Sequence, residues 1–119
     1  MDNQNNVLKL SFSYKYGYIR TSKNIIETLG HPKFVFLTFS KENNILSICG
    51  TEERNINCLL VERHKESDGS ECLKFCSLQF VKKLASYYDW NKGYKYVVIG
   101  KYNKLLRAVE FDLTTATIE

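Results

Sequence analysis

The hydrophobic positions first become regular over residues 22–29, where their spacing predicts a short helix. Ile25 and Leu29 are four residues apart and therefore share one helical face. Ser22 precedes them as a typical N-cap, since its hydroxyl accepts from the free amides of the first turn. Gly30 ends the segment because glycine takes a positive φ without strain. A helix of about two turns is marginal alone, so we expect tertiary packing to hold it.

Two strands follow this helix in a pattern typical of a hairpin. Residues 34–39 are apolar at almost every position, which indicates a central strand covered on both faces. Residues 41–44 are Lys-Glu-Asn-Asn and supply the turn. Residues 45–49 return as the second strand. The stretch 18–49 therefore reads as strand, helix and hairpin.

The same order recurs more weakly over residues 73–113. Ser77, Phe80, Val81 and Leu84 lie 55 positions after Ser22, Ile25, Ile26 and Leu29, which predicts a second helix over 77–88. Beyond it the best shift is 60, and this shift aligns Lys41 with Lys101 and Leu46 with Leu106. Two interpretations stay open: an internal repeat, or two similar units built by chance from common elements.

The remaining segments complete a single α+β domain over residues 1–119. Tyr14, Tyr16 and Tyr18 alternate and predict a strand with three rings on one face. Residues 56–61 are apolar and predict a buried strand, whereas residues 62–71 are polar and predict a loop. We expect a small β-rich domain of paired hairpins with two short helices. If the repeat is real, the domain is an internally duplicated barrel.

Composition excludes some classes of protein and weakens others. The chain has no run of 18 apolar residues, so no transmembrane helix is expected. Its N-terminal segment lacks the apolar core of a signal peptide, which favours a cytoplasmic location. A zinc site from Cys58, His64, Cys72 and Cys76 is rejected because their spacing fits no common site. The cysteines are expected to be reduced core residues, and no metal or cofactor is expected.

Charge is distributed unevenly along the chain. Residues 51–71 have a net charge of −3, whereas residues 72–107 have eight bases and one acid, a net charge of +7. Aromatic residues alternate with these bases, and Trp90 and Tyr94 are among them. Cations hold phosphates while rings stack on bases, so the segment predicts a phosphate-bearing ligand. A solvated surface without a ligand is the simpler alternative.

One segment resembles a known family of DNA-binding proteins. Lys23, Ile25, Leu29 and Gly30 match the strand-helix-hairpin core of AbrB and MazE type swapped-hairpin proteins. Two tandem copies of the unit resemble MraZ. Ser22 stands where that family has proline. The resemblance implies a DNA-binding regulator that acts as a homodimer.

A second resemblance is to small Firmicute and prophage proteins with an L-G-x-P-K-[YF]-[VI] segment, which residues 29–35 match. This resemblance implies no activity. It leaves open a phage-type protein that sequesters a nucleotide second messenger or masks a host protein. No motif for a nucleophile, a phosphate loop or paired catalytic carboxylates occurs, so we expect no enzyme.

These interpretations share one set of candidate binding residues, and the partner is DNA or a nucleotide. A DNA-binding protein needs a broad convex basic surface, whereas a nucleotide sponge needs a closed cleft lined by rings and an arginine. The candidate residues are Arg20, Lys23, Trp90, Tyr94, Lys101, Lys104 and Arg107.

Overall fold

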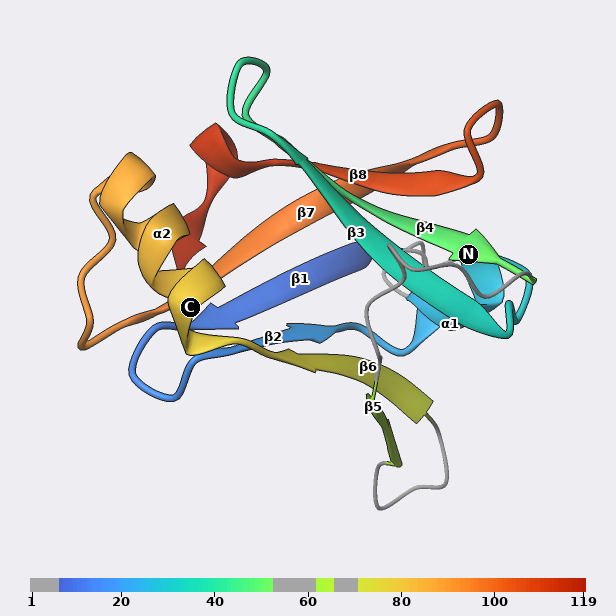
Figure 1. The fold of residues 1–119 in the computed structure, drawn as a ribbon, viewed down its shortest axis with the longest axis horizontal. Helices are drawn as coiled ribbons and strands as arrows, with labels where there is room; N and C mark the ends of the chain where they lie inside the picture. The colour runs from blue at the N-terminus through green and yellow to red at the C-terminus, as the bar shows by residue number, and fades with distance from the viewer. Residues whose placement is uncertain (1–6, 53–61, 66–70) are drawn as a thin grey trace.

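A computed structural model describes residues 7–52, 62–65 and 71–119, and it shows a small strand-rich domain with two α-helices (Figure 1). The expectation of a β-rich fold with two helices is confirmed. The elements in chain order are β1 (Leu8–Ser13), β2 (Tyr18–Thr21), α1 (Asn24–Thr28), β3 (Phe34–Ser40), β4 (Ile45–Thr51), β5 (Glu62–Lys65), β6 (Glu71–Cys76), α2 (Leu78–Tyr88), β7 (Lys95–Asn103), β8 (Ala108–Asp112), a 3₁₀ turn (Leu113–Thr115) and β9 (Thr117–Ile118).

The described strands form one antiparallel sheet that curls into a half-barrel. Their order is β3-β4-β8-β7-β1-β2-β6-β5, and the short β9 pairs with β7 off this path. Figure 1 shows α2 at one end of the curled sheet and α1 near the other. Within the described residues β3 lies at one end of the strand order. Among the described strands β3 is therefore an edge strand and not the central strand expected, although both of its faces are apolar.

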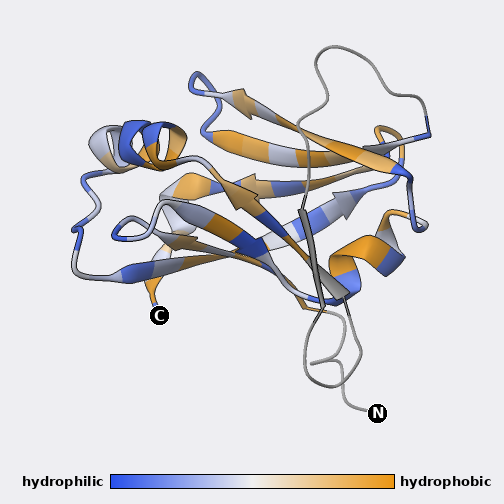
Figure 2. Cartoon of the chain, turned by 60° about the horizontal axis from the view of Figure 1, so that its bottom comes forward, coloured by the Kyte–Doolittle hydropathy of each residue, from blue (hydrophilic) through white to orange (hydrophobic). Residues whose placement is uncertain are grey.

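The core fills the concave side of the curled sheet. Its largest fully buried side chains include Phe12 and Phe111, from β1 and β8. The helices contribute Ile25, Val81 and Leu84, which have no exposed surface. Figure 2 shows one hydrophilic and one hydrophobic face on α2. Burial of that apolar face holds the helix in place, because the hydrophobic effect acts in proportion to the area removed from water.

The two helices begin differently. Ser77 caps α2, and its hydroxyl accepts from the Phe80 amide at 3.3 Å. The expectation that Ser22 caps α1 is wrong: Lys23 occupies the N-cap position and no side chain caps this helix. The Ser22 hydroxyl instead accepts from the Lys9 amide and donates to Asn24 Oδ1, so it ties the helix to β1. Gly30 has a φ of 79°, as its role in stopping the helix requires.

Two further expectations are wrong. Tyr14 and Tyr16 lie in the turn between β1 and β2, because Gly17 reverses the chain there with a φ of 69°. Residues 62–65 form β5 instead of a loop, since their backbone pairs with β6. The strand expected over 56–61, with Cys58, lies outside the described residues.

The second hairpin is also displaced from its predicted alignment. Residues 104–107 form the turn between β7 and β8, so Leu105 and Leu106 do not belong to the returning strand. The turn between β3 and β4 is residues 41–44, so the two turns are 63 positions apart and not 60. The sequence pattern pairs Lys41 with Lys101, whereas in the structure Lys41 and Lys104 occupy the same position in their turns.

Candidate nucleic-acid interface

One end of the molecule brings together segments from three separate parts of the chain. α2 is flanked there by the β1–β2 turn (14–17), the β3–β4 turn (41–44) and the loop 89–94; we call this surface the α2 end. The Ser77 amide donates to the Gly17 carbonyl at 2.9 Å, which fixes the first turn against the helix. The Tyr88 hydroxyl donates to Asn44 Oδ1 at 2.8 Å, which fixes the second.

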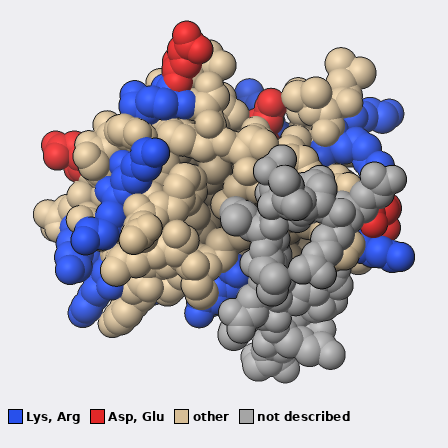
Figure 3. Space-filling model, in the orientation of Figure 1, with Lys and Arg blue, Asp and Glu red and all other residues tan. Residues whose placement is uncertain are grey.

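The α2 end is rich in lysine. Its lysines are Lys15, Lys41, Lys82, Lys83 and Lys92, all of them exposed. Figure 3 shows basic side chains in a band over the side of the molecule where α2 lies. The exposed acids of the same segments are Glu42 and Asp89. The excess of positive charge gives this surface an attraction for anions that falls with ionic strength.

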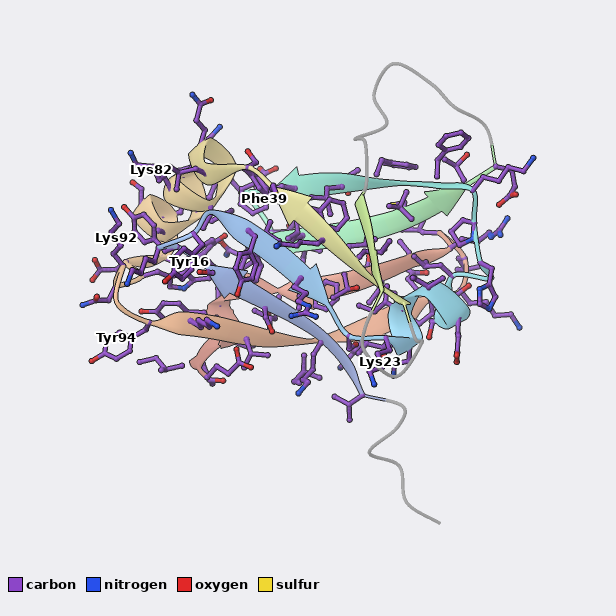
Figure 4. All side chains as sticks on the ribbon, turned by 90° about the horizontal axis from the view of Figure 1, so that it is seen from below. Tyr16, Lys23, Phe39, Lys82, Lys92 and Tyr94 are labelled. Carbon is purple, nitrogen blue, oxygen red and sulfur yellow. The ribbon has the colours of Figure 1, made fainter. Side chains whose placement is uncertain are left out.

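Exposed tyrosines lie among these lysines. Tyr16 is 67% exposed, Tyr94 49% and Tyr87 40%. The Lys15 ammonium lies 5.4 Å from the centre of the Tyr16 ring, and Lys41 lies 5.2 Å from that of Tyr87. These contacts hold positive charge beside the rings. Figure 4 shows Tyr16, Lys82, Lys92 and Tyr94 at the same end of the molecule, with Lys23 away from them near α1.

The ring of Trp90 belongs to the core beneath this surface. Tyr96 stacks on the indole at 4.9 Å, and Phe12 packs against it at a tilt, also at 4.9 Å. Only 9% of Trp90 is exposed. A nucleobase has no access to a ring covered in this way. Trp90 therefore anchors the loop after α2, where the Asn91 amide donates to the Tyr96 hydroxyl at 2.7 Å.

The structure does not bring the remaining candidate residues to the α2 end. Tyr94 precedes β7, whereas Lys104 and Arg107 follow it in the β7–β8 turn. A strand of nine residues spans roughly 30 Å at about 3.3 Å per residue. Tyr94 and Arg107 therefore do not line one pocket, and Lys101 lies on β7 close to the distant turn. All three cations are exposed.

Arg20 and Lys23 lie in two further places. Arg20 is half-buried on β2, opposite Ser11 of β1 and Lys74 of β6. Lys23 is exposed immediately before α1. The sequence therefore grouped candidate binding residues that the fold separates. The sequence did not identify the β1–β2 turn as part of the site, because the alternation of its tyrosines is also typical of a strand.

A pocket of about 340 Å³ opens between the start of α2, β3, and the strands β2 and β6. Its lining is Ile19, Leu37, Phe39, Phe75, Phe80, Cys76 and Ser77. Phe39 and Phe80 meet edge to face with their centres 6.2 Å apart. The lining has no charged side chain, so this pocket suits an apolar group and not a phosphate.

Two groups near the sheet have a shifted pKa. Burial raises the pKa of the Cys49 thiol, and the nearby Glu110 carboxylate raises it further. Burial also raises the pKa of Tyr88, with smaller contributions from Asp112 and Tyr87. Both groups are therefore neutral at physiological pH. The protonated Tyr88 hydroxyl is the form that donates to Asn44.

The described part of the chain offers neither a metal cluster nor a membrane-spanning helix. Among the side chains that the structure describes, in residues 7–52 and 73–119, no group of three or more His, Cys, Asp or Glu is arranged to hold a metal ion. No helix in the same residues is long and apolar enough to cross a membrane. The chain matches no protein-family model, no curated protein and no solved structure.

Proposed function

We propose that this protein is a non-enzymatic binding protein that holds nucleic acid at its α2 end. The observation that supports this is the meeting there of exposed lysines and exposed tyrosines from four segments of the chain. Lys82, Lys83 and Lys92 contact phosphates, while Tyr16 and Tyr94 stack on bases. Stacking needs unpaired bases, so single-stranded DNA binds more tightly than duplex.

The shape of the surface favours a polymer over a small nucleotide. The lysines are spread over a helix and the loops beside it (Figure 3), and the three tyrosines among them are 40–67% exposed. A nucleotide sponge would need rings and cations around one cleft. The described pocket is apolar, and Tyr94 and Arg107 lie at opposite ends of β7. Both features argue against capture of a nucleotide second messenger.

The decisive experiment compares two triple variants that remove the same charge from opposite ends of the molecule. The first is Lys82→Ala/Lys83→Ala/Lys92→Ala, and its matched control is Lys101→Ala/Lys104→Ala/Arg107→Ala. All six side chains are exposed, so neither variant is expected to disturb the core. Fluorescence anisotropy with labelled single-stranded and duplex DNA, at two salt concentrations, measures affinity and salt slope.

We expect the α2-end triple to weaken binding about tenfold or more and to reduce the salt slope by about 0.7 for each phosphate that the protein no longer neutralises. The control triple should bind like the wild type. Tyr94→Ala should lose roughly 1–3 kcal/mol of binding without changing the slope. If only the control triple lost affinity, the interface would lie on the β7–β8 hairpin and the proposed α2-end interface would be wrong. Absence of binding to either DNA would refute the proposal.

We propose further that the chain is an internal duplication of a β-β-α-β-β unit related to swapped-hairpin regulators. The halves have the same element order, β2 pairs with β6, and β4 pairs with β8. α1 packs against β6 and α2 against β2, so each helix contacts the other half. In an alignment of relatives, the two halves should match best at a shift of 63 over the hairpins; a random best shift would contradict duplication.

A further inference from the structure

The pocket beside the start of α2 is apolar, accessible and large enough for a small molecule. Three of its residues are phenylalanines, Phe39, Phe75 and Phe80. Phe39 and Phe80 are only half-buried and Cys76 of the same lining is exposed, so solvent reaches the pocket. An apolar cavity of about 150 Å³ holds a benzene molecule, and this pocket has a volume of about 340 Å³. It therefore has room for an aliphatic chain of medium length.

The four elements around the pocket carry cations and almost no acid. β2, β3 and α2 contain no Asp or Glu, and the one acid of β6, Glu71, lies at the end of that strand away from the pocket. The same elements contain Arg20, Lys74, Lys82 and Lys83. Figure 3 shows basic side chains along the side of the molecule where α2 lies. The surroundings of the pocket therefore favour an anionic ligand over a neutral or cationic one.

Two lysines lie at the edge of the pocket, where the polar head of a ligand would leave it. The Lys41 ammonium is 5.2 Å from the centre of the Tyr87 ring, and Tyr87 stacks on Phe39 of the pocket wall with ring centres 6.1 Å apart. Lys83 follows Phe80 by three residues and precedes Tyr87 by four, so the three share one face of α2. Both lysines are exposed. They are therefore placed to meet an anionic group just outside the apolar lining.

We propose that the pocket binds an amphiphilic anion: a carboxylate on an aliphatic chain of medium length. The chain lies against the phenylalanines, and the carboxylate meets Lys41 and Lys83 at the edge. Each buried methylene raises affinity about fourfold, whereas an exposed ion pair contributes about fivefold at most. The chain therefore supplies most of the affinity, and the lysines select the charge of the head. Lys41 and Lys83 also belong to the α2 end, but this inference does not require nucleic-acid binding.

Isothermal titration calorimetry with octanoate tests the proposal, at concentrations too low for micelles to form. We expect affinity to rise about fifteenfold from butanoate to hexanoate and again to octanoate, because each step buries two more methylenes. Octan-1-ol should bind about fivefold more weakly than octanoate, and octylammonium more weakly still, because neither has the negative charge that the lysines attract. Absence of octanoate binding, an affinity independent of chain length, or equal binding of octanoate and octylammonium overturns the proposal.

Two measurements locate the chain in the pocket. Leu37→Trp fills the pocket and should weaken octanoate binding about tenfold or more, because the indole takes the space of several methylenes. Its matched control is Ile99→Trp, at an exposed position of β7, which should bind like the wild type. In the wild type, octanoate should slow alkylation of Cys76 by iodoacetamide and leave that of Cys49 unchanged, because only Cys76 lines the pocket. An unprotected Cys76 at saturating octanoate overturns the assignment of the pocket.

A second pair of variants tests the role of the lysines. Lys41→Ala/Lys83→Ala should weaken octanoate binding about fivefold and leave the binding of octan-1-ol unchanged, because only the carboxylate forms ion pairs. The control Lys101→Ala/Lys104→Ala removes the same charge from the β7–β8 hairpin and should bind both ligands like the wild type. Far-ultraviolet circular dichroism confirms that each variant is folded. Equal losses of octanoate and octan-1-ol binding in the first variant would contradict an anion-selective site.

Discussion

The two hairpins β3–β4 and β7–β8 have the same backbone plan but expose different chemistry. In both, a four-residue turn ends on a residue in the left-handed region, Asn44 with a φ of 59° and Arg107 with a φ of 50°. In both, the side chain before the turn accepts from its third amide: Ser40 Oγ from Asn43, and Asn103 Oδ1 from Leu106. The turn geometry is thus common to both.

The difference lies in what each turn presents. Residues 41–44 are Lys-Glu-Asn-Asn and residues 104–107 are Lys-Leu-Leu-Arg. Asparagine adopts the left-handed region far more readily than arginine, and Asn44 is also bonded to Tyr88 of α2. The Arg107 guanidinium instead lies 4.0 Å from where a β-carbon on Gly30 would be, just past α1. Because the first turn shows what the backbone needs, the leucines and arginine of the second require another explanation.

The strands behind the turns also differ, and this difference predicts the largest effect on stability. The pair Leu37 and Ile48 in the first hairpin becomes Gly100 and Phe111 in the second. A β-carbon on Gly100 would lie 2.5 Å from the Phe111 ring. We expect Gly100→Ala to lower the free energy of unfolding by about 1–3 kcal/mol, because the buried ring must move. Urea denaturation measures this.

Two further variants test whether contact with the Phe111 ring causes the loss of stability expected for Gly100→Ala. Gly93→Ala meets nothing closer than Asn91 Oδ1, at 3.3 Å, and should have little effect. Adding Phe111→Leu to Gly100→Ala should recover part of the loss by removing the ring edge. A tolerated Gly100→Ala would contradict the close packing of this pair.

Exchanging the residues that close the turns should change stability in opposite directions. Asn44→Arg should lower the free energy of unfolding by about 1–2 kcal/mol, since it loses the Tyr88 hydrogen bond and strains the turn. Arg107→Asn should raise it by roughly 0.5 kcal/mol, because asparagine tolerates a positive φ. Thermal unfolding of both variants checks this prediction, and equal shifts of the same sign would refute it.

The smallest predicted effect concerns Cys49 on β4, the strand that pairs with β8 and so joins the two hairpins. Its pKa lies above the ordinary value of 9.0 because of burial and then Glu110, so it reacts more slowly with iodoacetamide at neutral pH than the exposed Cys76. Glu110→Gln should accelerate that reaction. At a pH below the ordinary thiol pKa, this shift has no effect on the free energy of unfolding. At higher pH the Cys49 thiol of the unfolded chain ionises before that of the folded protein, so the free energy of unfolding falls. Peptide mapping after timed alkylation distinguishes the two thiols.

Local signals in the sequence determined where some of the elements begin and end. Ser77 marked the start of α2 and Gly30 the end of α1, because capping depends on a few neighbouring residues. A run of apolar residues followed by the polar turn residues 41–44 identified the hairpin of β3 and β4. The excess of basic residues over positions 72–107 was also evident from the sequence, because net charge depends on composition alone.

Contacts between distant segments decided which of the remaining residues lie in strands and which lie in turns. Leu105 and Leu106 have the hydrophobicity of a strand, but the register of β7 and β8 leaves them in the turn. Tyr16 alternates like a strand residue, but Gly17 turns the chain so that β2 can pair with β1. In both cases backbone pairing with another strand outweighed the local pattern.

The candidate site shows the same division between local and tertiary information. The sequence placed Trp90, Tyr94 and Arg107 in one basic, aromatic segment. Tertiary packing buried Trp90 between Phe12 and Tyr96 and set the other two at opposite ends of β7. Proximity along a chain cannot distinguish these outcomes, because an extended strand carries its ends far apart while sheet pairing brings distant turns to one helix.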